Sequence, residues 1–395
     1  MKKSRLLVFL TVVFSLYTFI NVYIHTKAIN ALTMFGSEWS IPAFKVAFIF
    51  IVFSYPVARI LGKWLPVILA DFLSFIGGMW FAAILYFLLA IVSIDLFRFI
   101  IEFVPALNQI IIENIVRINA LAFGSITIVV FSLIIYGYFN AISPKLKTLD
   151  IRIAKSANGL EKLHVVFASD IHLGHIIGKR SLSRILEKIN ALNPDLVLFP
   201  GDLVDEELKP VIDKNLGELF KSLNPKYGVF AVSGNHEYIG GVESAVNYLS
   251  KFGITFLRDQ AIKINQSFYV AGREDVSTVS FYGKKRKTIH ELLEGTESNL
   301  PVIMMDHQPI ALNEAADNGV DLQISGHTHH GQMWPLQAIT KRVFLLSWGY
   351  KKIKESHFYV SSGAGSWGPR VRIGNHPEIV SLRLFFPVRP EEHQV

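Results

Sequence analysis

Long runs without a charged side chain occupy the first 143 residues, and they limit the choice of fold more than any other feature of the sequence. Four runs are long and apolar enough to be helices in a membrane: residues 6–24, 41–61, 72–94 and 118–143. A helix needs about 20 such residues to cross a hydrocarbon core of roughly 30 Å. Only the second run contains charges, Lys45 and Arg59, and both lie near its ends, where long side chains can reach the interface. We therefore predict a transmembrane helical bundle over residues 1–143.

Residues 95–117, between the third and fourth runs, have a different pattern. Their polar residues recur at steps of three, four or multiples of these numbers, at Asp95, Arg98, Glu102, Gln109, Glu113 and Arg117. On a helix this spacing draws a narrow polar stripe. We predict one or two interfacial helices that lie on the membrane. The alternative is a fifth crossing, which would move the rest of the chain to the opposite side.

Basic residues in the short flanking segments predict the orientation. They gather before the first span, between the second and third, and after the fourth, at Lys2, Lys3, Arg5, Arg59, Lys63, Lys145, Lys147 and Arg152. Because basic flanks stay in the cytoplasm, we expect both termini there. No small-residue cleavage site follows the first run, so we interpret it as an uncleaved helix. The protein is then an integral, multi-pass membrane protein, and a bacterial inner membrane fits this pattern.

The pattern changes after residues 144–159, which we interpret as a linker. From residue 160 to residue 395, short β-rich runs such as "LHVVFASD" and "DLVLFPGD" alternate with stretches of helical composition. Nearly continuous apolar strands that alternate with helices predict βαβ units in an α/β domain. The chain contains no Cys, so a metal site here has only His, Asp, Asn or Glu side chains as ligands. No long run of like charge indicates a nucleic-acid-binding groove.

Polar residues follow five of the predicted strands, at the point where each strand ends. The five clusters are Asp170 with His172, Asp202, Asn235 with His236, His307, and His327 with His329. In α/β folds, ligands bind at the carboxyl ends of the strands, so distant parts of the chain are expected to meet at one site. Each fragment alone has an ordinary interpretation as a turn or a loop. Their joint occurrence in this structural context favours a site.

These fragments resemble the motifs of the calcineurin-like metallophosphoesterases. They stand here as "DIHLG", "GDLVD", "GNHE", "DHQP" and "GHTHHGQ". The segment "GAGSWGPRVRIGNHPEIVSL" is similar to the closing segment of a membrane-anchored branch of membrane-associated or exported phosphohydrolases. The resemblance implies a four-layer α-β-β-α sandwich. It also implies hydrolysis of a phosphate ester or pyrophosphate bond by a hydroxide that bridges two metal ions.

The resemblance also assigns roles to individual residues. It implies that the metal ligands are Asp170, His172, Asp202, Asn235, His307, His327 and His329, with Asp202 shared by both ions. Two divalent ions are expected, and a mixed nitrogen and oxygen ligand set suits Mn, Fe or Zn. His236 is the expected general acid. We interpret Glu237 as the residue that orients the His236 imidazole.

Three further residues are candidates for substrate binding: Arg370, Arg372 and His330. The two arginines have the geometry for bidentate contacts to a phosphate, and surface salt bridges are the alternative. His330 is an additional imidazole next to the proposed ligands, for which a solvated position is the alternative. Arg342–Lys354 interleaves aromatic and basic residues; it is either a lipid-contacting surface or a β-hairpin with buried aromatic rings.

The leading hypothesis is a membrane-anchored, dinuclear metal-dependent phosphohydrolase whose catalytic domain is cytoplasmic. Its expected partners are membrane lipids and a phosphorylated substrate, with a lipid-linked phosphate as one hypothesis. One alternative is a phosphodiesterase that acts on soluble nucleotides. The other is a catalytically silent metal-binding sensor or scaffold at the membrane. The sequence leaves the physiological substrate, the metal and the oligomeric state open.

Overall fold

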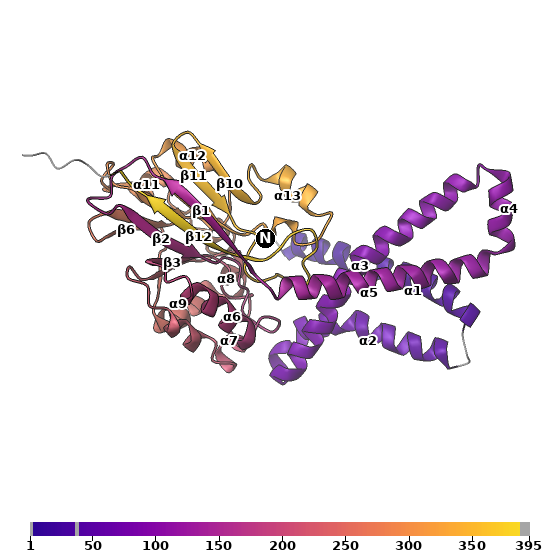
Figure 1. Cartoon of the computed structure of the whole chain (residues 1–395). Coiled ribbons are helices and arrows are strands. Elements are labelled where there is room, and N and C mark those ends of the chain that lie inside the picture. The colour runs from indigo at the N-terminus through magenta and orange to yellow at the C-terminus, as the bar shows by residue number, and fades with distance from the viewer. Residues whose placement is uncertain (1–2, 36–38, 388–395) are drawn as a thin grey trace, which may run out of the picture. The chain divides into compact units, whose positions relative to one another are not determined.

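The computed structural model describes residues 3–35 and 39–387, which form two compact units (Figure 1). The helical unit runs to Tyr138 and includes the short segment Gly368–Val371. The catalytic unit begins at Phe139 and contains the remaining described residues. Each unit is described separately below.

The helical unit contains five α-helices and one short 3-10 helix among the described residues. Their bounds are α1 Lys3–Phe35, α2 Ser40–Leu61, η1 Gly62–Trp64, α3 Val67–Ile101, α4 Pro105–Glu113 and α5 Ile115–Ala141. Four segments are long and apolar enough to cross a membrane: Thr11–Met34, Ser40–Trp64, Val67–Ile101 and Ile115–Ala141. About half of their large apolar side chains are exposed, as expected for helices that are solvated by lipid.

Contacts between the helices of this unit combine close packing with a few polar pairs. The backbone of Gly77 in α3 lies against Tyr55 in α2, where a Cβ atom would come within 2.4 Å of the tyrosine Cβ. Lys27 in α1 donates to both carboxylate oxygens of Asp95 in α3, at 2.7 and 2.6 Å. This pair lies just past residue 94, where the uncharged run of α3 ends. The stretch 95–117, predicted as one or two interfacial helices, is divided between the end of α3, α4 and the start of α5.

The segment predicted as a linker, residues 144–159, is not a free tether. It contains β1, Lys145–Arg152, which pairs in parallel with β12, Glu378–Phe385, over eight residues. Most β1 side chains are exposed, with Ile151 buried. An edge strand of this kind carries little hydrophobic signal, and the prediction of a linker was therefore wrong. The first sheet starts only three residues after α5.

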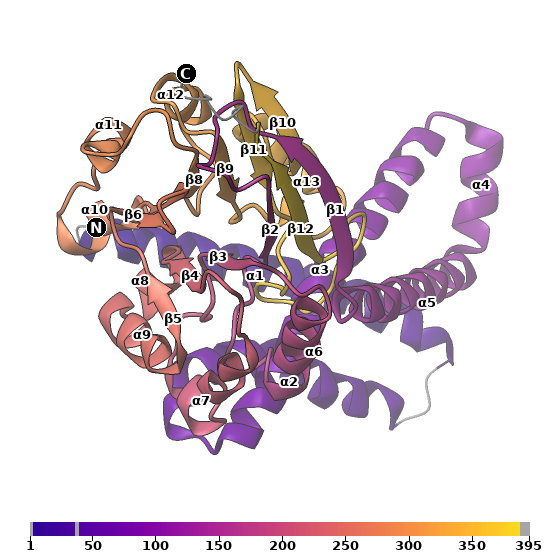
Figure 2. The same cartoon turned by 60° about the vertical axis from the view of Figure 1, so that its left-hand side comes forward.

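Two six-stranded sheets form the centre of the catalytic unit (Figure 2). The first has the order β1-β12-β2-β3-β4-β5, with β2 Lys162–Phe167, β3 Leu196–Pro200, β4 Val229–Val232 and β5 Ile254–Phe256. The second has the order β10-β11-β9-β8-β7-β6, with β6 Gln260–Ile264, β7 Phe268–Gly272, β8 Val302–Met305, β9 Leu322–Ser325, β10 Gly349–Ile353 and β11 Ser356–Val360. Strands β2 to β5 are parallel to one another, and so are β7, β8, β9 and β11.

Alternating apolar side chains on these strands build three cores. In β2, Val165 and Phe167 join a cluster shared with Ile303 and Met305 of β8, so the two sheets pack face to face. Val166, on the other face of β2, packs with the helices that cover the first sheet. A third cluster joins the outer face of the second sheet to its helices. This arrangement confirms the predicted four-layer α-β-β-α sandwich.

Short helices in the catalytic unit supply the two outer layers and the loops. The α-helices are α6 Lys179–Asn190, α7 Lys209–Asp213, α8 Asn235–Gly240, α9 Val242–Leu249, α10 Ser277–Tyr282, α11 Ile289–Leu293, α12 Leu312–Asp317 and α13 Gln337–Val343. The 3-10 helices are η2 Gly217–Ser222, η3 Ser250–Phe252 and η4 His329–Gly331. The loops that follow β2, β3, β4, β8 and β9 leave the carboxyl ends of parallel strands, and these five loops carry the candidate site.

Candidate metal centre and active site

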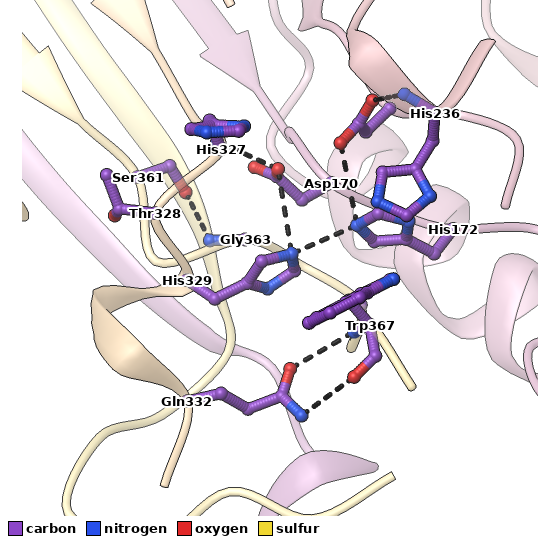
Figure 3. A network of polar contacts seen from close by, with 12 residues as sticks. Asp170, His172, His236, His327, Thr328, His329, Gln332, Ser361, Gly363 and Trp367 are labelled. Atoms are coloured by element: carbon purple, nitrogen blue, oxygen red, sulfur yellow. Dashed lines mark hydrogen bonds and ion pairs between the residues drawn. The ribbon is translucent and has the colours of Figure 1, made fainter. Parts of the chain in front are cut away.

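Five loops bring the seven predicted metal ligands together. Figure 3 shows four of them, Asp170, His172, His327 and His329. A shared feature of their backbone is a positive φ angle, between 45° and 70°, at Asp170, His172, Asp202, His327 and His329. Residues other than glycine rarely adopt this conformation, because it costs on the order of 1–3 kcal/mol. The concentration of such residues at one place is typical of a functional site, where the surrounding structure holds a strained loop.

One group of candidate ligands consists of Asp170, His172 and His329. The Nε2 atoms of the two histidines lie 3.0 Å apart, and Nε2 of His329 is 3.7 Å from Oδ1 of Asp170. All three side chains are buried. Two imidazole nitrogens and a carboxylate that converge in this way form a small mixed nitrogen and oxygen site.

A second group contains Asp202, Asn235, His307 and His327. Oδ1 of Asn235 lies 2.7 Å from Nδ1 of His327 and 3.2 Å from Nε2 of His307. Oδ2 of Asp202 lies 3.1 Å from the same His307 nitrogen and 3.8 Å from Nε2 of His172 in the first group. Asp202 therefore stands between the two groups, as expected for a ligand that both share.

Several details of these side chains fit a bound cation. Oδ2 of Asp170 is buried and has no hydrogen-bond partner in the described part of the chain, an arrangement that is costly unless a ligand satisfies it. Nδ1 of His307 donates to the carbonyl oxygen of Pro200 at 2.9 Å, which holds the ring with its Nε2 atom toward Oδ2 of Asp202. Gly326 has no room for a side chain, since a Cβ would lie 2.2 Å from the unpartnered Asp170 oxygen.

Charge controls the protonation of the candidate ligands. Burial disfavours the ionised carboxylate of Asp202, but the charge of His307 outweighs it, and the pKa of Asp202 falls far below its usual range. Burial first, and then the charge of His307, lower the pKa of His327. Burial and the guanidinium of Arg372 place the pKa of His329 well below its usual value. His327 and His329 are therefore neutral, which is the form that binds metals.

Asp205 is a member of the site that we did not identify from the sequence. Its Oδ1 lies 3.2 Å from Nδ1 of His236, and both side chains are largely buried. Burial alone would lower the pKa of His236, but the nearby carboxylates, with Asp205 the nearest, raise it to about 9. His236 is therefore a cationic hydrogen donor near neutral pH. Asp205 is the last residue of the motif "GDLVD", three residues after Asp202. This position in the motif could have identified it as a site residue.

Glu237 does not orient His236, so this prediction was wrong. Its carboxylate accepts hydrogen bonds from the backbone N–H groups of Asp202, Val204 and Gly234, at 3.1, 2.8 and 2.8 Å. Glu237 is the third residue of α8, and from there its side chain reaches back to the start of the helix. It joins the loop after β3 to the loop after β4. Glu237 thus supports two ligand-bearing loops.

The candidate substrate-binding residues lie elsewhere than predicted. Arg372 is fully buried; its Nη1 donates to the His329 carbonyl oxygen at 3.1 Å, and its Nη2 lies 3.0 Å from Nδ1 of His329. His330 is also buried, with its ring against Trp348 at a centroid distance of 5.2 Å, so the alternative of a solvated position is wrong, and its contact with substrate stays a prediction. Arg370 belongs to the helical unit, where it lies over the Tyr138 ring. Its contact with phosphate stays a prediction.

Trp367 is a second residue that the sequence pattern did not identify. Its ring lies 5.8 Å from the ring of His236, and about half of the residue is exposed. The side chain of Gln332 holds the Trp367 backbone through two hydrogen bonds (Figure 3). The indole is therefore a fixed apolar wall beside the proposed general acid.

Comparison with known proteins agrees with this geometry. Residues 163–331 match the family model of the calcineurin-like phosphoesterases. A transmembrane protein with a metallophosphoesterase domain from Danio rerio is 30% identical over 306 residues, which cover 73% of this chain and 70% of that protein. The chain belongs to the calcineurin-like phosphoesterase family. The predicted resemblance is thus confirmed.

The chain is also similar to a bacterial metallophosphoesterase and to a solved structure. A metallophosphoesterase of Helicobacter pylori strain J99 is 32% identical over 256 residues, which cover 63% of this chain and 66% of the relative. Among solved structures, a 5′-nucleotidase precursor from Thermus thermophilus is 13% identical with a TM-score of 0.37, over 57% of this chain and 54% of that one. This calcineurin-like phosphoesterase is a metal-dependent hydrolase, and its four apolar helices indicate a membrane protein.

Proposed function

We propose that the protein is a membrane-anchored phosphohydrolase with two divalent metal ions, Mn, Fe or Zn. One observation carries this proposal: Oδ2 of Asp202 lies near His172 of one ligand group and His307 of the other, at 3.8 and 3.1 Å. Asp170, His172, His329 and Asp202 would hold one ion, and Asp202, Asn235, His307 and His327 the other. When bound, the metals would polarise the phosphoryl group and lower the pKa of a water molecule.

The protein's own residues supply positioning and a proton. The backbone N–H of His236 donates to Oδ1 of Asp202 at 2.9 Å, which holds the proposed bridging carboxylate and the start of α8 together. The His236 imidazole, kept protonated by Asp205, would donate its proton to the oxygen of the leaving group. Trp367 limits the access of water to that side of His236.

The proposed substrate is a lipid-linked phosphate ester or pyrophosphate. The four apolar helices support this proposal, because a soluble substrate requires no membrane anchor. The catalytic unit is also attached without a long linker, since three residues separate α5 from β1. A phosphodiesterase for soluble nucleotides and a silent metal-binding scaffold remain the competing hypotheses.

Turnover by the full-length protein in detergent tests the enzymatic proposal. We expect added Mn to restore hydrolysis of phosphate esters after chelation, and metal analysis to find two ions per chain. The Asp202→Asn variant should lose both metal and activity. Full cellular function of this variant would instead support the silent scaffold. A preference for soluble nucleotides over lipid-linked esters in vesicles would support the soluble-nucleotide hypothesis.

The proposed location is a bacterial inner membrane, with the catalytic unit in the cytoplasm. The excess of basic residues in the flanks of the apolar helices supports this orientation. A reporter that is active only outside the cytoplasm, fused after the last residue, should be inactive. An active fusion would place the catalytic unit outside and would reverse the assigned orientation.

A further inference from the structure

We infer that residues 277–287, which we call the α10 turn, form a contact surface for the anionic headgroups of a lipid bilayer beside the active site. This inference deepens the proposed function and rests on it for the nature of the substrate. The α10 turn consists of helix α10 and the basic segment Gly283–Lys287. It lies outside the segment Arg342–Lys354 that the sequence pattern indicated.

The exposed side chains of the α10 turn are apolar and basic. Val279, Phe281 and Tyr282 are each about half exposed, at 50%, 50% and 47%. Lys284, Lys285 and Lys287 follow directly and are exposed. No acidic residue occurs between positions 276 and 290, so the charged residues of the segment itself are all basic. Aromatic and aliphatic side chains next to lysines are typical of surfaces that insert into the headgroup region of a membrane.

The base of the α10 turn is held rigidly. Nη1 of Arg286 donates to Oδ1 of Asp306 at 2.8 Å, and Nη2 of Arg273 donates to the Lys287 carbonyl oxygen at 3.1 Å. The backbone N–H of Lys287 donates to Oδ2 of Asp259 at 2.9 Å. Because these bonds fix the backbone, the exposed side chains are presented without a large entropic cost of ordering.

The bond between Arg286 and Asp306 also places the α10 turn at the rim of the site. Asp306 directly precedes the candidate ligand His307. The rings of Phe281 and Tyr282 lie 6.2 and 5.8 Å from the ring of Tyr238, two residues after His236 in α8. A bilayer that contacts the α10 turn would therefore lie next to the proposed general acid. This position suits a lipid-linked substrate, whose phosphate would reach the site from the headgroup layer.

The segment Arg342–Lys354 is a weaker candidate for such a surface. Residues 349–353 form β10 of a hairpin with β11, as the alternative interpretation expected, although Trp348 and Tyr350 remain partly exposed. Lys352 forms an ion pair with Glu355, and Lys354 forms one with Asp317. No ion pair with an acidic side chain occurs at Lys284 or Lys285 within the described residues. The α10 turn therefore carries the larger uncompensated charge.

A single fluorescent label tests the inference, because the native chain contains no cysteine. The exposed Ser280 in α10 is replaced by Cys and labelled with an environment-sensitive dye in the full-length protein. The protein is then reconstituted into phosphatidylcholine vesicles with or without phosphatidylglycerol. We expect a blue shift, and quenching by spin-labelled lipids, only with phosphatidylglycerol. The Lys284→Glu/Lys285→Glu variant should abolish both signals, because each lost lysine weakens surface binding about fivefold.

A matched control reverses the same charge elsewhere on the catalytic unit. The Lys226→Glu/Lys251→Glu variant also replaces two exposed lysines, and it should retain the blue shift and the quenching. Equal signals in both lipid compositions, or in both variants, would overturn the inference. A blue shift in detergent that grows with protein concentration would indicate self-association and would also overturn it. These signals require no catalysis, so a failed activity assay and a failed lipid contact remain distinguishable.

Discussion

Replacement of Asp205 by Asn tests the proposed role of His236 most directly. The variant keeps the shape of the side chain and a hydrogen-bond acceptor, but it removes the negative charge 3.2 Å from Nδ1 of His236. At an effective dielectric constant of about 20, opposite unit charges at this separation attract by about 5 kcal/mol, an upper bound on the effect. Measured effects of one close charge on a pKa are about 1–3 units. We therefore expect the pKa of His236 to fall from about 9 toward about 7.

The expected consequence depends on pH in a defined direction. A general acid must be protonated, so activity is present below the pKa of His236 and is lost as the pH rises through it. With a fall of about two units, both proteins are largely protonated near pH 6, but the protonated fraction of the variant near pH 8.5 is about 20-fold smaller. The ratio of wild-type to variant kcat should therefore grow about 20-fold over this range.

The choice of substrate separates proton donation from other effects of the substitution. An alkyl phosphate ester needs a proton on its leaving oxygen, whereas a nitrophenyl ester has a stable leaving group and does not. Asp205→Asn should thus impair the alkyl ester far more than the nitrophenyl ester. Glu206→Gln is a matched control, because Oε1 of Glu206 is farther from His236 Nδ1, at 3.7 Å, and its side chain is more exposed.

Two outcomes would contradict this reasoning. Equal losses for both esters, together with a lower metal content, would show that Asp205 acts through His172, whose Nδ1 is 3.6 Å from the same carboxylate oxygen. An unchanged pH profile for the alkyl ester would show that His236 is not the acid.

Three further substitutions and one treatment test other parts of the site. Gly326→Ala should abolish metal binding, measured by elemental analysis, because the new Cβ would lie 2.2 Å from Oδ2 of Asp170. Glu237→Gln should lower the free energy of unfolding by about 1–3 kcal/mol in denaturant titrations, because two loops lose charge-assisted bonds, while the metal content stays unchanged. Arg372→Met should weaken metal binding, measured by calorimetry, without raising KM for a soluble ester, since Arg372 contacts His329 and is fully buried. A raised KM with unchanged metal binding would instead support the interpretation of Arg372 as a phosphate contact. Removal of the metals by chelation should lower the Tm, because a ligand at 100 times its Kd stabilises the folded state by about 2.7 kcal/mol.

The sequence predicted alternating strands and helices and the convergence of the candidate ligands because both follow from local patterns, whereas the four-layer sandwich was implied by the family resemblance. Apolar runs such as Leu196–Pro200 identify buried strands, and the polar residue after each run lies at a strand carboxyl end. The edge strand Lys145–Arg152 has one buried side chain and several basic residues, so its composition is that of a linker. It becomes a strand only because β12 pairs with it. Long-range pairing of this kind leaves no local signal.

The errors at Glu237, Arg372 and His330 have a related cause. The residue type suggested a role for each side chain. The actual role depends on the direction in which the side chain points, and the backbone conformation sets that direction. Glu237 points back along α8 to Gly234, whereas Arg372 points into the protein behind His329. Asp205 faces His236 because the loop after β3 turns back toward α8. None of these directions can be read from residue spacing.

The histidine loop shows how backbone conformation assigns different roles to similar neighbours. His327, His329 and His330 all have positive φ angles, so their side chains leave the chain in different directions. His327 faces Asn235, His329 faces His172, and His330 packs on Trp348. Such a loop needs external support, because each strained residue costs on the order of 1–3 kcal/mol.

The closing segment of the chain provides that support. Nδ2 of Asn375 donates to the carbonyl oxygens of His329 and His330, at 2.8 and 3.1 Å, and Arg372 donates to the same His329 oxygen. These bonds satisfy the carbonyl groups that a strained loop would otherwise leave buried and unpaired. Burial and the Arg372 guanidinium together hold the pKa of His329 well below its usual value. The sequence "GPRVRIGN" therefore contributes to metal binding through the backbone that carries the ligands, and this accounts for a buried arginine where the sequence had suggested a contact to phosphate.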